Sequence, residues 1–257
     1  MSFGIILAVA AIAFVAGAVN GIAGFGFAVV GTMALALVFD PATAVVFMIA
    51  PLVAVNLSLV GELGAAELQS CGRRFGPLIL AATAGTLVGM ALLGRLPEAP
   101  LRVALGVVSL SFVATSQRLV TVPGIERARD GCFVETPLAM TGVGAVSGIL
   151  FGATNVGVQL VAYVRSCNLS HGLFVGVLAL IFLGINFIRI GAAAILGLYP
   201  DLTVVAASAA AAVPAVAGVA VGKRLRHRFT ERTRRTAVLG LLTIVGLRLL
   251  ADGVGAV

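Results

Sequence analysis

The chain has 257 residues, of which 60% are hydrophobic and only 11% are charged, and its mean hydropathy is +1.16. Soluble globular proteins carry about a quarter charged residues, so this composition excludes a soluble domain and predicts an all-α integral membrane protein. The net charge of +7 does not indicate nucleic-acid binding, because seven of the 17 basic residues lie in one run, 223–235, as is typical of a cytoplasmic loop between spans.

Charges, prolines and glycines divide the chain into apolar segments, most of which have the length of a membrane-spanning helix, about 20 residues. The first segment lacks the basic residues that begin a signal peptide, and it is longer than the apolar region of a signal peptide. We therefore expect it to stay in the membrane. We expect eight segments, at 4–39, 42–61, 76–94, 101–117, 138–164, 172–197, 203–222 and 236–251.

Two of these segments are longer than one span requires. Segment 4–39 would form a helix of roughly 54 Å and segment 138–164 one of roughly 40 Å, whereas the hydrocarbon core is about 30 Å thick. Both contain several glycines in their middle, which favour a helix break. In the first segment we expect the break at 21–26.

The second half of the chain repeats the first. Residues 17–22 (GAVNGI) match 144–149 (GAVSGI), and Val55-Asn56-Leu57 matches Ile185-Asn186-Phe187. Two weaker matches follow in the same order, Gly94-Arg95 with Gly222-Lys223 and Leu105-Gly106-Val107 with Leu239-Gly240-Leu241. Internal duplication is common in secondary transporters. The sequence therefore predicts two repeated four-segment halves, 1–117 and 137–257, joined by a loop at 118–136.

The distribution of Arg and Lys favours inverted halves. If all eight segments span the membrane, the loops on the side of 223–235 hold 10 basic residues and those on the other side hold 5. If 4–39 and 138–164 are re-entrant hairpins, the halves become inverted and the counts become 13 and 2. The second arrangement obeys the positive-inside rule better. We therefore expect two re-entrant hairpins, with 118–136 and 223–235 on the cytoplasmic side.

The glycine box of the first half is the first candidate site. Gly24 and Gly26 alternate with phenylalanines, and Asn20 precedes them by about one helical turn. The box is not a dinucleotide-binding fingerprint, because Val29 stands where that motif has its third glycine. It serves either close packing of helices through small residues or a helix break whose exposed amides face an anion.

The second half offers a comparable group of polar residues and glycine, namely Gly152, Thr154, Asn155 and Gln159. Uncharged polar side chains inside a membrane either join helices or line a cavity. Because Asn20 and Asn155 both lie beside helix-breaking glycines, we expect a cavity where the two halves meet.

Asn56 and Asn186 are repeat-related, and each either pins helices together or binds a ligand. Arg189 follows Asn186 on the same helix face, roughly 12 Å inside the segment end. It either snorkels to the interface or offers a fixed positive charge to an anion. The segments are nearly free of Asp and Glu, whereas transporters of protons or metal cations usually carry buried carboxylates. These features predict an anionic substrate.

The repeat, the length and the glycine box together resemble the sulfite exporter TauE/SafE family of membrane transporters over nearly the whole chain. The first box of that family is similar to residues 17–27, which an Asp40-Pro41 turn follows, and its second box is similar to 144–152. Asn20 and Ser147 depart from the family, since many members have an acidic residue there. The resemblance implies transport of sulfite, sulfonates or related organic anions.

We therefore expect a secondary transporter for a small anion, working by alternating access as a multi-pass protein of the cell (inner) membrane. An anion channel and a permease for a neutral solute are the alternatives. An enzyme is not expected, because the sequence has no nucleophile–base pair, metal cluster or cofactor motif. We expect no cofactor, no metal and no nucleic-acid partner. The expected partners are the small anion and the lipid bilayer, and the sequence is compatible with a homo-oligomer.

Overall fold

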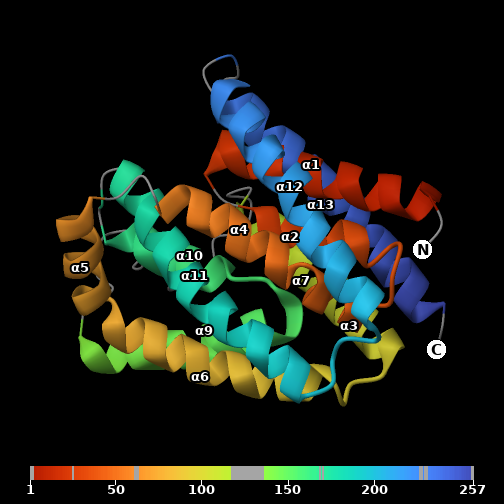
Figure 1. Cartoon of the computed structure of the whole chain (residues 1–257), viewed down its shortest axis with the longest axis horizontal. Coiled ribbons are helices and arrows are strands. Elements are labelled where there is room, and N and C mark those ends of the chain that lie inside the picture. The colour runs from red at the N-terminus through yellow and green to blue at the C-terminus, as the bar shows by residue number, and fades with distance from the viewer. Residues whose placement is uncertain are drawn as a thin grey trace.

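The structure is a computed structural model that describes residues 3–255 apart from 25, 61–63, 117–135, 168, 170, 226–227 and 229–230. Its described elements are α-helices joined by short turns (Figure 1). The first half contains α1 (Phe3–Ala23), α2 (Phe27–Leu35), α3 (Pro41–Phe47), α4 (Ile49–Val60), α5 (Ala65–Arg74), α6 (Gly76–Leu93) and α7 (Glu98–Ser116). The second half contains α9 (Pro137–Thr154), α10 (Val158–Ser166), α11 (His171–Ile195), α12 (Leu202–Leu225) and α13 (Glu231–Val254).

The first long apolar segment breaks where the glycines predict it. α1 ends at Ala23 and α2 begins at Phe27. Gly24 and Gly26 lie between them with φ angles of 81° and 105°. Residues with a Cβ rarely adopt such angles, so these two glycines permit the sharp reversal from α1 into α2.

The second long segment also breaks, but one helical turn later in the repeat. α9 ends at Thr154, and Asn155 caps it in the left-handed conformation with a φ angle of 59°. By the match of 17–22 with 144–149, Thr154 corresponds to residue 27, four residues beyond the end of α1. Both halves therefore place a nine-residue helix, α2 or α10, after an internal break.

The segment predicted at 42–61 forms two helices, α3 and α4, which meet at Met48. Pro51 has no backbone N–H, so it leaves the carbonyl of Phe47 without its helical donor. The hydroxyl of Ser208 on α12 donates to this carbonyl. A neighbouring helix thus satisfies the backbone group that the proline frees.

The connection between α4 and α6 contains a helix, α5, that the sequence analysis did not predict. Cys71 on α5 is buried, whereas Gln69, Ser70, Arg73 and Arg74 are exposed. One buried and one polar face are typical of a helix that lies along a surface. The short helix escaped prediction because its composition is that of a polar loop.

Glycines bring α1 into close contact with α12. A Cβ at Gly218 would collide with the carbonyl oxygen of Phe14, and a Cβ at Gly222 would collide with that of Ala18. The residue numbers of the two helices rise together along the contact, so α1 and α12 are parallel. Small residues that let backbones approach closely are a common means of helix association in membranes.

The same arrangement joins α9 to α6. A Cβ at Gly148 would collide with the carbonyl oxygen of Ala82, and a Cβ at Gly152 would collide with that of Thr86. These helices are parallel as well. The first apolar segment of each half therefore packs against the third apolar segment of the other half.

These contacts correct one of the sequence matches. Gly85 lies against the carbonyl oxygen of Ala145, as Gly222 lies against that of Ala18. Since Ala18 and Ala145 are repeat-related, Gly85 is the counterpart of Gly222, and the match of Gly94 with Gly222 is wrong. The mismatch arose because glycines are frequent in both helices and identity alone does not fix their register.

Six described helices or helix pairs are long and apolar enough to cross a membrane, at 4–22, 41–60, 76–93, 137–154, 173–195 and 202–225. Large apolar side chains on their outer faces are exposed, including Leu80, Ile195 and Val213. The chain is therefore a multi-pass membrane protein. α7 and α13, which correspond to the segments at 101–117 and 236–251, pack antiparallel, and the Ser109 hydroxyl donates to the Leu242 carbonyl at 3.0 Å.

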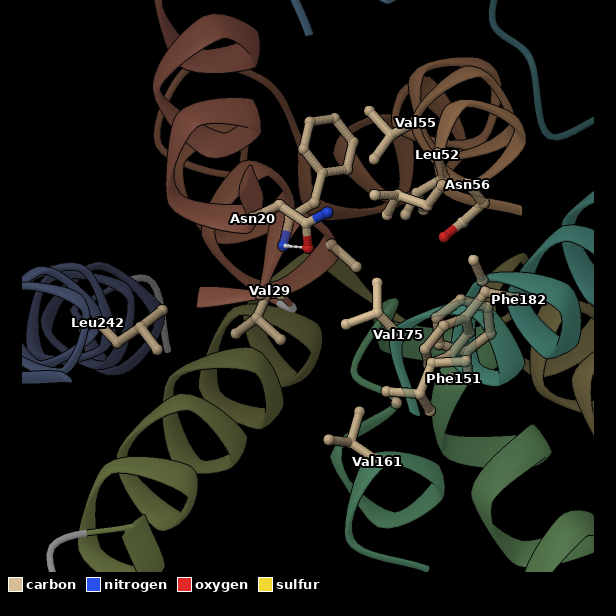
Figure 2. Close-up of a pocket in the computed structure, with 18 residues that line it drawn as sticks. Asn20, Val29, Leu52, Val55, Asn56, Phe151, Val161, Val175, Phe182 and Leu242 are labelled. Carbon is tan, nitrogen blue, oxygen red and sulfur yellow. Dashed lines mark hydrogen bonds between the residues drawn. The ribbon is translucent and has the colours of Figure 1, made fainter. Parts of the chain in front are cut away.

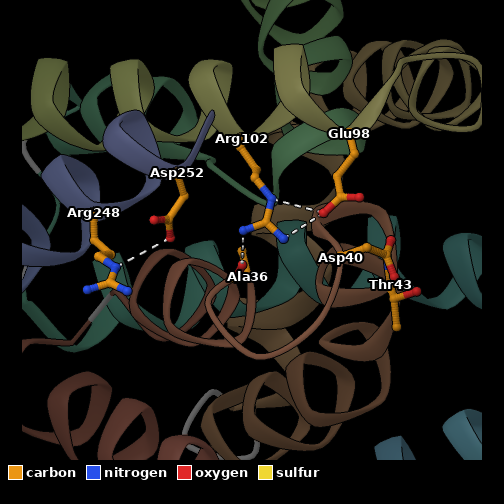
Figure 3. Close-up of polar contacts among 7 residues, drawn as sticks. All are labelled: Ala36, Asp40, Thr43, Glu98, Arg102, Arg248 and Asp252. Carbon is orange, nitrogen blue, oxygen red and sulfur yellow. Dashed lines mark hydrogen bonds and ion pairs between the residues drawn. The ribbon is translucent and has the colours of Figure 1, made fainter. Parts of the chain in front are cut away.

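Polar contacts hold the end of α2 that lies away from its break (Figure 3). Arg102 on α7 pairs with Glu98 at 2.6 Å and also donates to the carbonyl of Ala36, directly after α2, at 3.5 Å. Asp40 then caps α3 by accepting from the backbone N–H of Thr43 at 2.9 Å. α2 is thus fixed at its C-terminal end, where a positive charge is favourable.

Candidate functional site

A cavity lies between the two halves of the protein (Figure 2). Residues of α1, α2 and α4 line it from the first half, and residues of α9, α10, α11 and α13 line it from the second. Its volume of about 60 Å³ has room for roughly four to six water-sized groups. A ligand of a few heavy atoms fits this space.

The N-terminus of α2 forms one wall of the cavity. Gly24, Gly26 and the first residues of α2 line it. The side-chain oxygen of Asn20 accepts from the backbone N–H of Phe27 at 3.4 Å, and the Asn20 carbonyl accepts from Gly24 N–H at 2.7 Å. First-turn N–H groups have no partner within their own helix, and they carry the positive end of the helix dipole. This wall therefore attracts negative charge.

The break before α10 forms part of the opposite wall. Gly157 lines the cavity and precedes the first residue of α10. A Cβ at this position would lie 2.6 Å from the Phe182 ring and 3.2 Å from the Phe151 ring. A larger residue at this position would have to displace the two rings. Two helix N-termini, one from each half, consequently border the same cavity.

Asn56 is the polar side chain that α4 contributes to the cavity. It is buried, and its amide nitrogen has no acceptor in the part of the chain that the structure describes. An unpaired buried amide costs free energy. The Asn56 amide is therefore a donor available to a ligand.

Asn155, in contrast, holds the two halves together. Its side-chain nitrogen donates to the Thr32 hydroxyl at 2.8 Å and to the Val45 carbonyl at 2.9 Å. Thr154 bonds locally, donating to the Leu150 carbonyl at 2.6 Å. Neither residue lines the cavity. The sequence correctly places Asn155 at a break, and its side chain serves in the contact between the halves.

Gly152 and Gln159 also lie outside the cavity lining. Gly152 belongs to the close contact of α9 with α6. The side-chain oxygen of Gln159 is buried and accepts no hydrogen bond among the described residues. Of the ten predicted site residues, the structure gathers four around the cavity: Asn20, Gly24, Gly26 and Asn56.

Arg189 and Asn186 form a buried pair beside the cavity. Arg189 is 0% exposed, so it does not snorkel out of the protein. Its guanidinium donates to the side-chain oxygen of Asn186 at 3.0 Å and lies over the Phe151 ring, 4.9 Å from the centroid. The Asn186 nitrogen donates to the Phe182 carbonyl at 2.8 Å, which orients its oxygen toward Arg189. Phe151 and Phe182 line the cavity, whereas Arg189 lies behind them.

Much of the cavity wall could not be predicted from the sequence. Leu52, Val55, Phe151, Val175 and Phe182 line it, yet they are apolar residues in apolar segments and carry no distinguishing signal. The described lining contains no charged side chain. Among the described residues, no His, Cys, Asp and Glu side chains are grouped closely enough to hold a metal ion.

Comparison with known proteins gives one match. Residues 9–249 match the family model described as sulfite exporter TauE/SafE. No curated protein and no solved structure gives a significant match to the chain. The matched span covers both halves, including all residues of the cavity.

Proposed function

Because the chain belongs to the sulfite exporter TauE/SafE family, we propose that it is a secondary transporter that moves a small anion, such as sulfite or a small sulfonate, across the cell membrane. The anion binds in the cavity between the halves. Asn56 and the first turn of α2 donate hydrogen bonds to it, and the second helix N-terminus, at α10, adds favourable potential.

The observation that carries this proposal is the meeting of two helix N-termini at an uncharged cavity. Each belongs to a nine-residue helix that follows an internal break. Half-helices whose N-termini point at an anionic group are a known device of transporters with repeated halves. A cation site would need carboxylates, and the described lining has none. A neutral solute would gain little from two positive helix ends.

The helix directions support inverted halves. α12 leads into the basic run that starts at Lys223, which we assign to the cytoplasmic side. α1 is parallel to α12 and so points toward the cytoplasm, whereas α9 is parallel to α6. α13 begins after this basic run and α7 packs antiparallel to it, so α7 points toward the cytoplasm and α6, which precedes α7, points away from it. Inverted halves of this kind favour alternating access over a permanent channel.

Reconstitution into liposomes tests the proposal. Uptake of radiolabelled sulfite should saturate, and unlabelled sulfite inside the vesicles should drive counterflow. Sulfate, methanesulfonate and acetate serve as competitors, and alanine serves as the neutral solute. Flux that grows linearly with concentration and shows no counterflow would identify a channel. Faster flux of alanine than of any anion would overturn the anion assignment.

A further inference from the structure

Arg189 does not line the cavity, so an anion in the cavity does not account for its buried guanidinium. Its Nε and Nη2 atoms are buried and have no acceptor among the described residues. No described carboxylate pairs with it either, since Glu98 pairs with Arg102, Asp252 pairs with Arg248, and Asp40 and Asp201 cap helices. An unpaired buried arginine is costly, so a role that requires its charge is expected.

One aromatic ring separates this guanidinium from the cavity. Phe151 lines the cavity and also lies against the guanidinium of Arg189, whose Cζ is 4.9 Å from the centroid of the ring. The ring of Phe182 supports Phe151, with 5.1 Å between the centroids and 34° between the planes. Figure 2 shows the two rings side by side at the edge of the cavity. Rotation of Phe151 would connect the cavity to Arg189.

Arg189 also lies on α11 between the cavity, which Phe182 lines, and the turn that follows the helix. Phe182 and Arg189 are seven residues apart on α11, about 10 Å along the helix. Burial raises the pKa of Tyr199, in the turn after α11, and the positive charge of Arg189 opposes that rise, which places the two groups near each other. In the topology proposed above, this turn faces away from the cytoplasm.

We propose that Arg189 is a second anion position, which Phe151 separates from the cavity and which the anion occupies on its way between the cavity and the non-cytoplasmic side. This inference rests on the proposed function and adds a two-position path with an aromatic gate. The two free donor atoms of Arg189 suit two oxygens of a sulfite or sulfonate. Asn186 fixes the guanidinium in place.

Chemical modification of arginines measures the access to Arg189. Purified protein is treated with phenylglyoxal, and peptide mass spectrometry gives the modification rate of each arginine. Phe151→Ala should raise the rate at Arg189 by about 10-fold, because the substitution removes its cover and its cation–π contact. Phe151→Leu, which keeps more of the side-chain volume, should raise it less. Methanesulfonate should slow the modification of Arg189 in both variants by at least about 3-fold, as a bound anion would.

Two controls make the measurement specific. Arg248, whose side chain is 70% exposed, should be modified equally in every sample, with or without methanesulfonate. Val175→Ala widens the cavity at a residue about 21 Å along α11 from Arg189, so the rate at Arg189 should stay at the wild-type value. A rate at Arg189 that methanesulfonate leaves unchanged in both Phe151 variants would overturn the second position.

A comparison of binding with flux separates this inference from the proposed function. Arg189→Gln should retain sulfite binding within about 3-fold, because the cavity is unchanged. It should lose at least about 90% of the flux, because the charge that holds the anion at the second position is gone. Arg189→Lys keeps the charge and should recover part of the flux. Normal flux in folded Arg189→Gln overturns the second position alone, whereas a wild-type protein without anion flux overturns the proposed function.

Discussion

The two halves share a helical frame but use their repeat-related polar positions differently. In the first half, Asn56 lines the cavity with a free amide nitrogen. Its counterpart Asn186 is fully buried and bonded to Arg189 and Phe182. Leu59 lines the cavity, whereas the residue at its repeat position in the second half is Arg189. The glycine contacts between helices are therefore the same in the two halves, whereas the polar residues at repeat-related positions have different partners.

The largest effects should come from the feature that the halves share. A Cβ at Gly21 would collide with the Val219 carbonyl, and one at the repeat-related Gly148 would collide with the Ala82 carbonyl. We expect Gly21→Ala and Gly148→Ala each to lower the free energy of unfolding by about 3 kcal/mol. Folded yield and melting temperature in detergent measure this loss.

Gly191→Ala is the matched control for these substitutions. Gly191 lies in α11 with no atom within 4 Å of its added Cβ, so alanine should be neutral or stabilise the helix by up to about 1 kcal/mol. A large loss in only one of the two glycine variants would show that the halves are not held together in the same way.

The next largest effect should come from Asn155, which joins the halves. Its substitution removes hydrogen bonds to Thr32 and Val45, and its φ angle of 59° is strained for alanine. Asn155→Ala should lower the free energy of unfolding by about 2 kcal/mol. Asn155→Gly should lose roughly 1 kcal/mol less, because glycine accepts this conformation. Equal losses in chemical denaturation would show that the backbone angle is unimportant.

The repeat-related asparagines should give opposite phenotypes. Asn56→Ala should weaken sulfite binding by roughly 10-fold, since it removes a donor to a charged ligand, and should leave the melting temperature nearly unchanged. Asn186→Ala should lower the free energy of unfolding by about 1–3 kcal/mol because it removes the acceptor of the buried Arg189 guanidinium and the side-chain bond to the Phe182 carbonyl. Equilibrium binding and thermal unfolding of both variants check the contrast. Similar losses of binding in the two variants would remove the functional difference between the halves.

The smallest effect should come from the backbone angle at the cavity. Gly26 has a φ angle of 105° and only Val19 near an added Cβ, at 3.7 Å, so Gly26→Ala should cost about 1–2 kcal/mol of backbone strain. Gly197, with a φ angle of 64° in the turn after α11, is the control. Both alanine variants should lose some stability, and only Gly26→Ala should also weaken sulfite binding. Loss of binding in Gly197→Ala would mean that global strain, and not the α2 N-terminus, sets the affinity.

The arrangement of the helices could be predicted in part from the sequence, because apolar length and glycine content are strong indicators of spans and breaks. Excess apolar length and glycines predicted breaks in 4–39 and 138–164, and the structure has both. The membrane class followed from composition alone. The division into eight apolar segments, two of them re-entrant hairpins, and the inversion of the halves stay predictions, and the helix directions support the inversion. The split at Met48 depends on Pro51, a single residue within an otherwise uniform apolar segment.

The cavity was less predictable than the frame. Asn20, Gly24, Gly26 and Asn56 combine a polar or flexible residue with an apolar context, and that contrast is visible in the sequence. Asn155 and Asn186 have the same contrast, yet they bond within the protein. Sequence patterns show that a polar group is buried, but only packing decides whether its partner is protein or ligand.

The most direct test of the account is the position of the anion itself. Crystals grown with selenite, a heavier analogue of sulfite, would give an anomalous signal from selenium. The account predicts a peak inside the cavity, within hydrogen-bond reach of the Asn56 amide and the first turn of α2, and its loss in Asn56→Ala. A peak confined to arginines on the protein surface, with the cavity empty at saturating selenite, would contradict it.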